Sequence, residues 1–191
     1  MMRVKHHDMR YTMRNWTNRT TYLAAALSLA GCASGPMAPD RTFRDTGKPL
    51  SVTTRGNGMQ DMGGPWFVRG YFPGDGGLAM VTLLPDLRGQ EAVEFRTEAC
   101  LLSGDCETDT EIWLARPLGQ NRWQLNREGA APRQMWVVWV DDDFRTAAIG
   151  TPDGSYGWIL DRRPEGGADR LRAAAEILNF NGYDTSRIKV R

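Results

Sequence analysis

The sequence predicts an all-β barrel or sandwich with a single helix near its C-terminal end. Two observations support this prediction. Between residues 66 and 162, eight short segments rich in aromatic and branched residues alternate with turns of Gly, Pro and Asp at the spacing of hairpins. After them, residues 165–180 carry apolar side chains at near-helical spacing.

The eight expected strands are short, and each is bounded by a recognisable turn signal. Proline and glycine interrupt a strand because proline lacks the N–H of the ladder and glycine adopts turn conformations. Pro73–Gly77, Pro117–Gln120 and Thr151–Gly154 are the clearest of these breaks. The expected strands are residues 66–73, 78–84, 91–100, 110–117, 121–128, 134–141, 144–150 and 155–162.

The expected helix, about residues 165–181, has a narrow apolar side. Leu171, Ala174 and Leu178 form that side, and Gly182 follows as the residue that ends the helix. So narrow an apolar face predicts a helix packed on the outside of the β-structure rather than within it. Residues 187–191 form a last short expected strand.

The N-terminal segment has the pattern of a bacterial lipoprotein signal peptide, residues 1–31. Five Lys and Arg precede an apolar run over 21–30, which is too short to span a bilayer. The run ends in Leu-Ala-Gly before Cys32, whose thiol would take up lipid after cleavage. The alternative is an ordinary secretory signal with a chance cysteine. A start at Met13 would give a signal of more usual length, and Ala33 is consistent with sorting to the outer membrane.

Residues 32–60 are expected to be the lipidated cysteine, a tether and an entry strap, because they are rich in Pro and Gly without periodicity. Residues 61–191 are expected to be the folded domain. Several acyl chains hold a protein on a bilayer where one does not, so the lipid alone would suffice as anchor. The expected location is the periplasmic face of the bacterial outer membrane.

Charge and histidine content exclude several classes of function. Without residues 1–31 the chain has 19 Lys and Arg against 22 Asp and Glu, a net charge of −3. Nucleic-acid binding, which needs a basic face, is therefore not expected. Both histidines, His6 and His7, fall in the signal segment. A mature chain without histidine excludes Ser-His-Asp and Cys-His catalysis and every His-ligated metal site.

Cys100 and Cys106 are expected to form a disulfide. The compartment beyond the inner membrane is oxidising, and Ser103-Gly104-Asp105 supplies a turn between the two residues. A disulfide that closes so short a loop stabilises the folded state by roughly 2 kcal/mol in the chain-entropy model. A redox-active pair is the alternative, although the spacing is not that of a CxxC motif and no basic neighbour lowers a thiol pKa.

Three motifs occur in order along the chain. Gly64-Pro65-Trp66 opens the first strand, Asp141–Phe144 joins two late strands, and Arg162 ends the eighth strand before the helix. In this order, and behind a lipoprotein signal, they resemble the lipocalins, and among them the bacterial outer-membrane lipoproteins. The resemblance covers about residues 41–191. The loop over 74–77 is shorter than the family's usual first loop.

The resemblance implies an eight-stranded antiparallel up-and-down barrel, or calyx, with the helix outside. Gly64, Trp66, Asp141 and Arg162 would then be structural residues, with no catalytic role. Trp66 and Arg162 would meet where the barrel closes, and a guanidinium over an indole face contributes about 0.5–2 kcal/mol. The calyx would hold one small ligand.

Strict alternation along the strands assigns the candidate calyx residues. Trp136 and Trp139 differ in parity, so alternation requires one of them to point inward. A polar ligand head at the rim could meet Arg69, Arg96, Arg116 or Arg145, which otherwise are solvated surface residues. The alternative for the aromatic residues is that they simply fill the core. The ligand-binding candidates are Val68, Gly70, Phe72, Trp136, Trp139, Tyr156 and Trp158.

The favoured function is binding, transport or storage of a hydrophobic amphiphile, either a fatty acid such as palmitate or a lysophospholipid. One alternative is an envelope scaffold with a filled barrel, which the lack of a cavity of about 300 Å³ would favour. Another is a lipocalin-fold enzyme without histidine, which free thiols at Cys100 or Cys106 would favour. No cofactor and no metal are expected. Asp141–Asp143 lack the ligand spacing of a Ca²⁺ loop.

Overall fold

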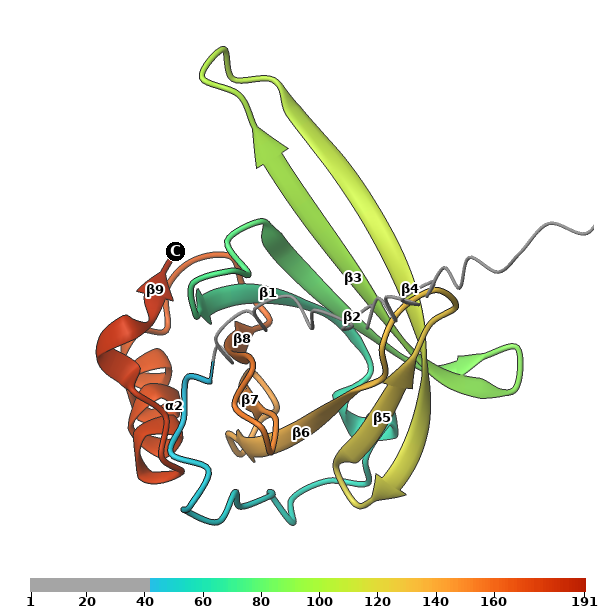
Figure 1. Cartoon of the computed structure of the whole chain (residues 1–191), viewed down its shortest axis with the longest axis vertical. Coiled ribbons are helices and arrows are strands. Elements are labelled where there is room, and N and C mark those ends of the chain that lie inside the picture. Colours follow the sequence, from blue (N-terminus) through green and yellow to red (C-terminus); the bar gives the residue numbers. More distant parts are fainter. Residues whose placement is uncertain (1–41) are drawn as a thin grey trace, which may run out of the picture. The chain divides into compact units, whose positions relative to one another are not determined.

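The computed structural model describes residues 42–191, which form a closed antiparallel barrel with one helix on its outer wall (Figure 1). The expected signal peptide, residues 1–31, and Cys32 lie outside the described residues. The helices are α1 (Met59–Met62), α2 (Ala168–Phe180) and the short 3-10 turn η1 (Thr185–Arg187). The strands are β1 (Gly64–Tyr71), β2 (Leu78–Leu87), β3 (Gln90–Cys100), β4 (Cys106–Gly119), β5 (Arg122–Asn126), β6 (Arg133–Val140), β7 (Thr146–Gly150), β8 (Gly157–Asp161) and β9 (Lys189–Val190).

Each strand from β1 to β8 pairs antiparallel with the next, and β1 closes the barrel by pairing with β8 as well. Trp66 lies opposite Val81 of β2, while Val68 lies opposite Leu160 of β8. The short β9 pairs with the end of β1. The predicted eight-stranded barrel with a helix outside is therefore confirmed.

The turns follow from residues that tolerate left-handed backbone. Arg88 and Gly89, with φ of 56° and 84°, join β2 to β3 in two residues. Positive φ at both positions is the conformation that matches the twist of a hairpin. Phe144, with φ of 53°, lies in the turn from β6 to β7.

Two hydrophobic clusters lie on opposite faces of the barrel wall. The inner cluster fills the barrel and includes Trp66, Trp123, Leu125, Met135 and Trp158. The outer cluster lies between the wall, the strap and α2. Its buried members are Phe43, Phe72, Val138, Ala148, Ile159, Ala174, Leu178 and Tyr183.

Helix α2 begins three residues later than predicted. Gly166 and Gly167 have φ of 77° and 71°, so neither continues a helix backwards from Ala168. Its expected apolar side does face the wall, where Ala174 and Leu178 are fully buried. Arg170 fixes it further through Asp161 of β8, at 3.1 Å. No helix within residues 42–191 has the length and apolarity needed to cross a bilayer.

The strap is described from residue 42 and crosses the outer wall. Arg44 is buried there and donates hydrogen bonds to the carbonyls of Lys48, Pro152 and Asn181. Sequence analysis did not predict α1, a single turn whose Met59 and Met62 are fully buried against the barrel core. These two side chains therefore seal one end of the barrel from below.

The hairpin of β3 and β4 extends far beyond the rest of the sheet (Figure 1). Pairing with β2 ends at Thr97, and pairing with β5 ends at Leu114. We call the projecting part, residues 97–111, the arm. A disulfide joins Cys100 to Cys106 at its tip, as predicted, with an S–S distance of 2.04 Å. The expected strand 110–117 is therefore much longer in the structure.

Candidate functional site

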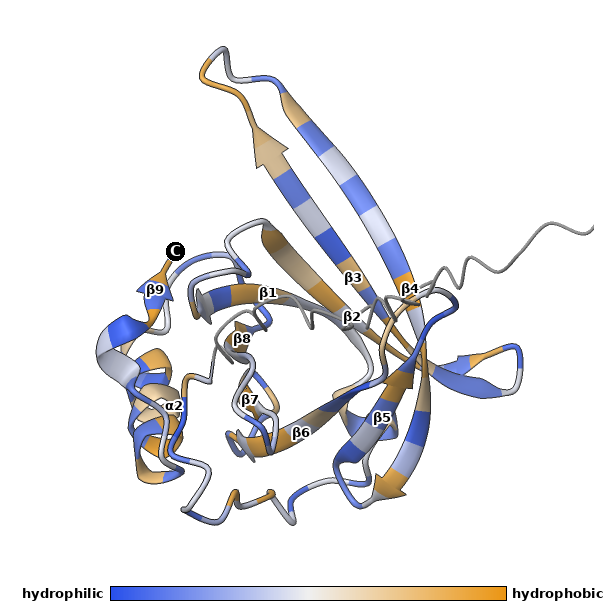
Figure 2. Ribbon diagram, in the orientation of Figure 1, coloured by the Kyte–Doolittle hydropathy of each residue, from blue (hydrophilic) through white to orange (hydrophobic). Residues whose placement is uncertain are grey.

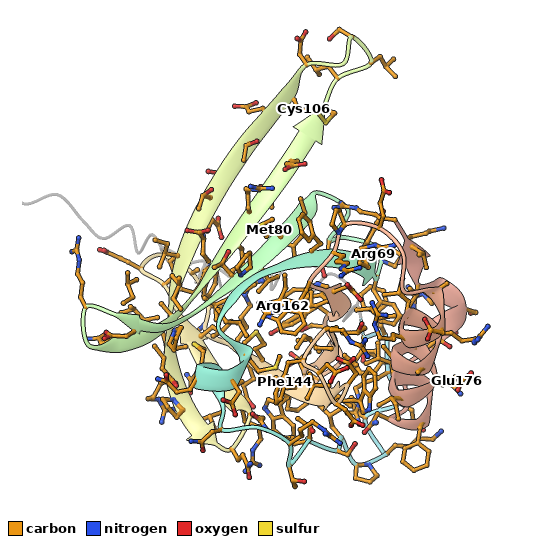
Figure 3. The ribbon with its side chains drawn as sticks, turned by 180° about the vertical axis from the view of Figure 1, so that it is seen from behind. Arg69, Met80, Cys106, Phe144, Arg162 and Glu176 are labelled. Atoms are coloured by element: carbon orange, nitrogen blue, oxygen red, sulfur yellow. A yellow bond between two sulfur atoms is a disulfide. The ribbon has the colours of Figure 1, made fainter. Side chains whose placement is uncertain are left out.

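The sealed end of the barrel is built around Arg162 and Trp66 (Figure 3 shows Arg162 within the barrel end). The Arg162 guanidinium carbon lies 3.8 Å from the centroid of the Trp66 ring. Its Nη atoms donate to the carbonyls of Gly63 at 2.8 Å and Pro65 at 3.0 Å. Burial lowers the pKa of Arg162. Gly64 has φ of 92° and leaves room for the guanidinium, because a Cβ there would lie 3.3 Å from Nη1.

The turn between β6 and β7 is held by Asp141. Its carboxylate accepts hydrogen bonds from the backbone N–H groups of Arg145 at 2.5 Å and Thr146 at 2.8 Å, and from Arg145 Nε at 2.9 Å. Burial raises the pKa of Asp141, but these hydrogen bonds outweigh it, and the net shift is downward. Asp141 thus stabilises a turn, and no group of three metal-ligating side chains occurs in residues 42–191.

The interior of the barrel is largely filled by side chains. Trp66, Trp123, Leu125 and Met135 each expose 2% or less of their surface. A cavity lies at the open end, next to the loop between β1 and β2. Its volume is about 270 Å³. This lies just under the range of about 300–1,000 Å³ that is typical of small-molecule sites.

Arg133, the first residue of β6, lines this cavity within an aromatic cage. Its guanidinium carbon lies 4.2 Å from the ring centroid of Trp113, 4.8 Å from that of Phe95 and 5.8 Å from that of Tyr156. Its buried Nε has no hydrogen-bond partner. No ion pair within the described residues includes Arg133. The cavity therefore presents a cation whose donors are only partly used.

Two carboxylates share the cavity with Arg133. Asp75 accepts a hydrogen bond from Trp158 Nε1 at 2.9 Å. Burial raises the pKa of Asp75, against smaller opposing effects of this hydrogen bond and of Arg133. Glu111 is already occupied, because it accepts from Trp113 Nε1 at 3.1 Å and pairs with Arg127 at 3.0 Å. The Arg133 guanidinium therefore has no ion-pair partner among the carboxylates of the cavity, and it can bind an anionic group of a ligand.

A row of carboxylates continues from the cavity onto the arm. Glu107, Asp109 and Glu111 share one face of β4, since side chains alternate along a strand. Glu111 lines the cavity, so this face is the continuation of the inner wall. Figure 2 shows hydrophilic residues alternating with neutral ones along this strand. The mouth of the barrel therefore presents the cation Arg133 in the cavity and the carboxylates of Asp109 and Glu107 farther out along the arm.

Three of the predicted calyx residues lie inside the barrel. Val68, Tyr156 and Trp158 belong to the inner cluster. The Tyr156 and Trp158 rings are stacked with centroids 4.4 Å apart, and Trp158 alone of the three lines the cavity. Burial raises the pKa of Tyr156, whose hydroxyl donates to the Gln134 carbonyl.

The predictions for Gly70 and Phe72 were wrong. The pairing of β1 with β8 shifts register between Val68 and Gly70, and this bulge reverses the faces that follow. A Cβ on Gly70 would meet Ile159 of the outer cluster at 3.1 Å. Phe72 packs in that same cluster, stacked on Phe43 at 4.9 Å.

The prediction that Trp136 or Trp139 points inward was also wrong. A second bulge, between Val137 and Trp139, breaks the alternation on which the parity argument rested. Met135, Val137 and Val140 face the inner cluster. Trp139 packs against the outer cluster, and Trp136 lies beside Arg122, whose guanidinium carbon is 5.4 Å from the ring centroid. Both tryptophans therefore lie outside the calyx.

None of the four predicted rim arginines lines the cavity. Arg69 is buried on the outer wall, Arg96 pairs with Glu98, Arg116 donates to Gln124 and Arg145 holds the Asp141 turn. Sequence reasoning missed Arg133, although its alternation with Met135 and Val137 places it on the inner face of β6.

The sequence comparisons agree with this geometry over the C-terminal part of the chain. Residues 120–191 match a family model described as "Lipocalin-like domain". The chain is also similar to temperature-induced lipocalin-1 of Arabidopsis thaliana, with 36% identity over 53 residues. That alignment covers 28% of this chain and 28% of the plant protein.

Solved structures extend the agreement to the barrel. Apocrustacyanin C2 superposes with a TM-score of 0.54 at 11% identity, covering 78% of this chain and 87% of that one. Apocrustacyanin C1 gives 0.53 at 12% identity, with 81% and 92% covered. Lobster apocrustacyanin A1 gives 0.50 at 12% identity, with 69% and 77% covered. At these identities the superpositions establish the fold alone, and the match to the lipocalin-like family model is confined to residues 120–191.

Proposed function

We propose that this protein is a lipid-anchored lipocalin of the bacterial periplasm that binds an amphiphile through an anionic group placed on Arg133. The observation that carries the proposal is the caged Arg133 at the open end of the barrel, with its buried Nε lacking a partner. A planar guanidinium binds carboxylate and phosphate in paired hydrogen bonds. Fatty acids and lysophospholipids both offer such a group.

The size of the cavity limits how much of the ligand it encloses. About 270 Å³ accommodates the anionic group and the carbons next to it. The rest of the acyl chain would leave the mouth away from the arm, because Thr97 and Ala99 on its inner face lie opposite the carboxylates of Asp109 and Glu107. The ligand would therefore be held by its head more than by its tail.

The acidic row favours a lysophospholipid over a fatty acid. A lysophospholipid with an ammonium group carries a cation a few bonds away from its phosphate. With the phosphate on Arg133, that cation would lie near Asp109 and Glu107, which have no basic partner within the described residues. A fatty acid leaves these carboxylates unmatched, and they would repel its head.

Tryptophan fluorescence tests the proposal, because Trp158 lines the cavity and the Trp113 ring contacts the Arg133 guanidinium. Titration with a lysophosphatidylcholine should change the emission with a Kd below about 100 μM, and palmitate should bind at least roughly tenfold more weakly. Arg133→Met should weaken lysophospholipid binding at least about tenfold. Arg116→Gln, an exposed arginine on the outer wall, is the matched control. Equal affinity of Arg133→Met and the unchanged protein would refute the site.

The lipid anchor has its own test. Mass spectrometry of the N-terminal peptide should show Cys32 carrying acyl chains, and Cys32→Ser should release the protein from the outer-membrane fraction. An unmodified Cys32 in membrane-free fractions would contradict anchoring without affecting the proposed ligand site.

A second candidate function is an envelope scaffold with a filled barrel. The buried interior favours it, since Trp123, Leu125 and Met135 of the inner cluster each expose 2% or less of their surface. If no amphiphile binds below about 100 μM, the scaffold becomes the better account. A thiol enzyme is disfavoured, because Cys100 and Cys106 are joined.

A further inference from the structure

We propose that the tip of the arm docks into an apolar pocket beneath α2 of a second copy of this chain. This inference does not rest on the ligand site, since the tip of the arm and the pocket beneath α2 share no residue with the lining of the cavity at the mouth, which only the base of the arm reaches. It rests on two features that the barrel itself does not require: an exposed acidic arm with an apolar tip, and an apolar pocket with a basic rim.

The arm is exposed far more than a strand pair in a barrel needs to be. All residues from Ala99 to Thr110 are exposed. A two-stranded ribbon with no partner is marginally stable in water, and here the Cys100–Cys106 disulfide closes its end. The cross-link keeps the ribbon paired in the absence of a packing surface, which suits an element that presents its tip to another molecule.

The tip carries two adjacent leucines. Leu101 is 70% exposed and Leu102 is fully exposed. They lie in the only turn of the arm, next to the disulfide, and Figure 2 shows this apolar tip beyond hydrophilic strands. The arm carries five carboxylates, Glu98, Asp105, Glu107, Asp109 and Glu111, and no Lys or Arg. Its partner must therefore offer an apolar recess surrounded by positive charge.

Such a recess lies on the outer wall between α2, β1, β8 and the C-terminal segment. Its volume is about 310 Å³, larger than the cavity at the mouth. Leu171 and Ala175 of α2 form one side, with Ile159 of β8 beneath and Ile188 opposite. A pocket of this volume has room for a pair of leucine side chains.

The charge of the pocket is opposite to that of the arm. Arg69 and Arg172 line it, and none of its lining residues is acidic. Arg69 is 8% exposed and donates to the carbonyls of Arg163 and Gly166 at 3.2 Å each. Neither Arg69 nor Arg172 takes part in an ion pair within residues 42–191. Arg172 is exposed and can therefore meet carboxylates of an incoming arm. Arg69, whose Nε and Nη2 also donate to the Arg191 carbonyl, adds positive charge to the lining of the pocket.

The contact must be between two molecules. Figure 1 shows the arm running away from the barrel with its tip well clear of α2 and β9, and Figure 3 places Arg69 beside α2 while Cys106 lies out along the arm. A stapled ribbon cannot fold back over that distance. Two copies that exchange arms reciprocally would form a closed pair, and one-way contacts would form chains. A lipid surface is the less suitable partner, because five carboxylates repel anionic lipids.

Sedimentation velocity of the full chain with Cys32→Ser tests the proposal, since that substitution prevents both lipidation and cross-linking at residue 32. The chain should self-associate at about 100 μM, the range of small transient contacts. The association should weaken with salt, because the Debye length falls from about 10 Å at 0.1 M to about 3 Å at 1 M. Leu101→Asp with Leu102→Asp, and separately Arg172→Glu, should each weaken self-association at least about tenfold.

A mixing experiment distinguishes this contact from any other. The double-leucine variant keeps an intact pocket, and the Arg172→Glu variant keeps an intact arm, so an equimolar mixture should associate where each alone does not. Phe180→Asp, at an exposed aromatic on α2 outside the pocket, is the matched control and should associate normally.

Leu101, Leu102, Arg172 and Phe180 are exposed, and unchanged thermal unfolding will establish that the variants fold. A chain that stays monomeric at about 100 μM overturns the proposal. So does self-association that survives both variants, or a failure of the mixture to associate. Leucine-dependent binding of monomers to phosphatidylcholine vesicles would overturn it in favour of a membrane contact.

Discussion

Removal of the Arg162 guanidinium should cost about 3 kcal/mol of folding free energy, and the structure indicates where the loss comes from. The stack on Trp66 at 3.8 Å contributes about 0.5–2 kcal/mol. The hydrogen bonds to the carbonyls of Gly63 and Pro65, at 2.8 and 3.0 Å, have a charged donor and contribute roughly 1.5 kcal/mol each. The cost of burying the guanidinium, seen in its lowered pKa, offsets part of this sum.

Urea unfolding of Arg162→Ala, followed by tryptophan fluorescence, measures the loss directly. A decrease of about 3 kcal/mol is a large part of the roughly 5–15 kcal/mol of a typical domain. It should lower Tm by roughly 6–12 °C for a chain of this size. Arg163→Ala is the control, since its side chain is exposed and only its backbone is used. A loss within about 0.5 kcal/mol of the control would refute the idea that this stack and its hydrogen bonds close the barrel.

Three further predictions concern the carboxylates and the disulfide. Asp141→Asn should lower stability by roughly 1–3 kcal/mol at neutral pH. Because the folded pKa of Asp141 lies below its ordinary value of 3.8, the difference from the unchanged protein should vanish as pH falls through that folded pKa, as measured by urea midpoints from pH 2 to about 7. Asp75→Asn should act in the opposite direction: its raised folded pKa means that ionisation destabilises the fold, so the variant should gain stability relative to the unchanged protein as pH rises above 3.8, and a loss at neutral pH would contradict this. Cys100→Ser should loosen the arm and leave the barrel intact, seen as faster hydrogen exchange confined to residues 97–111; exchange that also rises in β7 would show instead that the disulfide supports the whole domain.

Sequence reasoning was reliable where the fold is set by local residues. The turn signals at Pro73–Gly77 and Thr151–Gly154 separate strands in the structure as they do in the sequence. The apolar side of α2 and the Cys100–Cys106 pair were also predicted, because helical spacing and a short loop specify them directly. The start of α2 was missed by three residues, since two glycines with positive φ precede it.

The interior of the calyx was harder to predict, because it depends on contacts between distant strands. Alternation assigns faces only while a ladder is regular, and the register shifts in β1 and β6 appear only when those strands pair with β8 and β7. Trp136 and Trp139 could not both have been placed outside on parity alone. Arg133 was missed for another reason: an arginine at a strand end is usually a surface residue, and only the aromatic cage of Phe95, Trp113 and Tyr156 distinguishes this one.

The bulges in β1 and β6 also determine which kind of sequence change the protein tolerates least. In each strand one extra residue lets the same segment serve both the inside of the barrel and the surface under α2. Because Val137 faces inward while Val138 and Trp139 both face outward, loss of Val138 would restore simple alternation and leave Trp139 outside and Val140 inside. Insertion or loss of a residue in a regular part of these strands would instead turn every side chain beyond it to the other face. We therefore expect the bulges to be the points where these strands best tolerate the loss of a residue, and the regular parts to be where a change of length is most damaging.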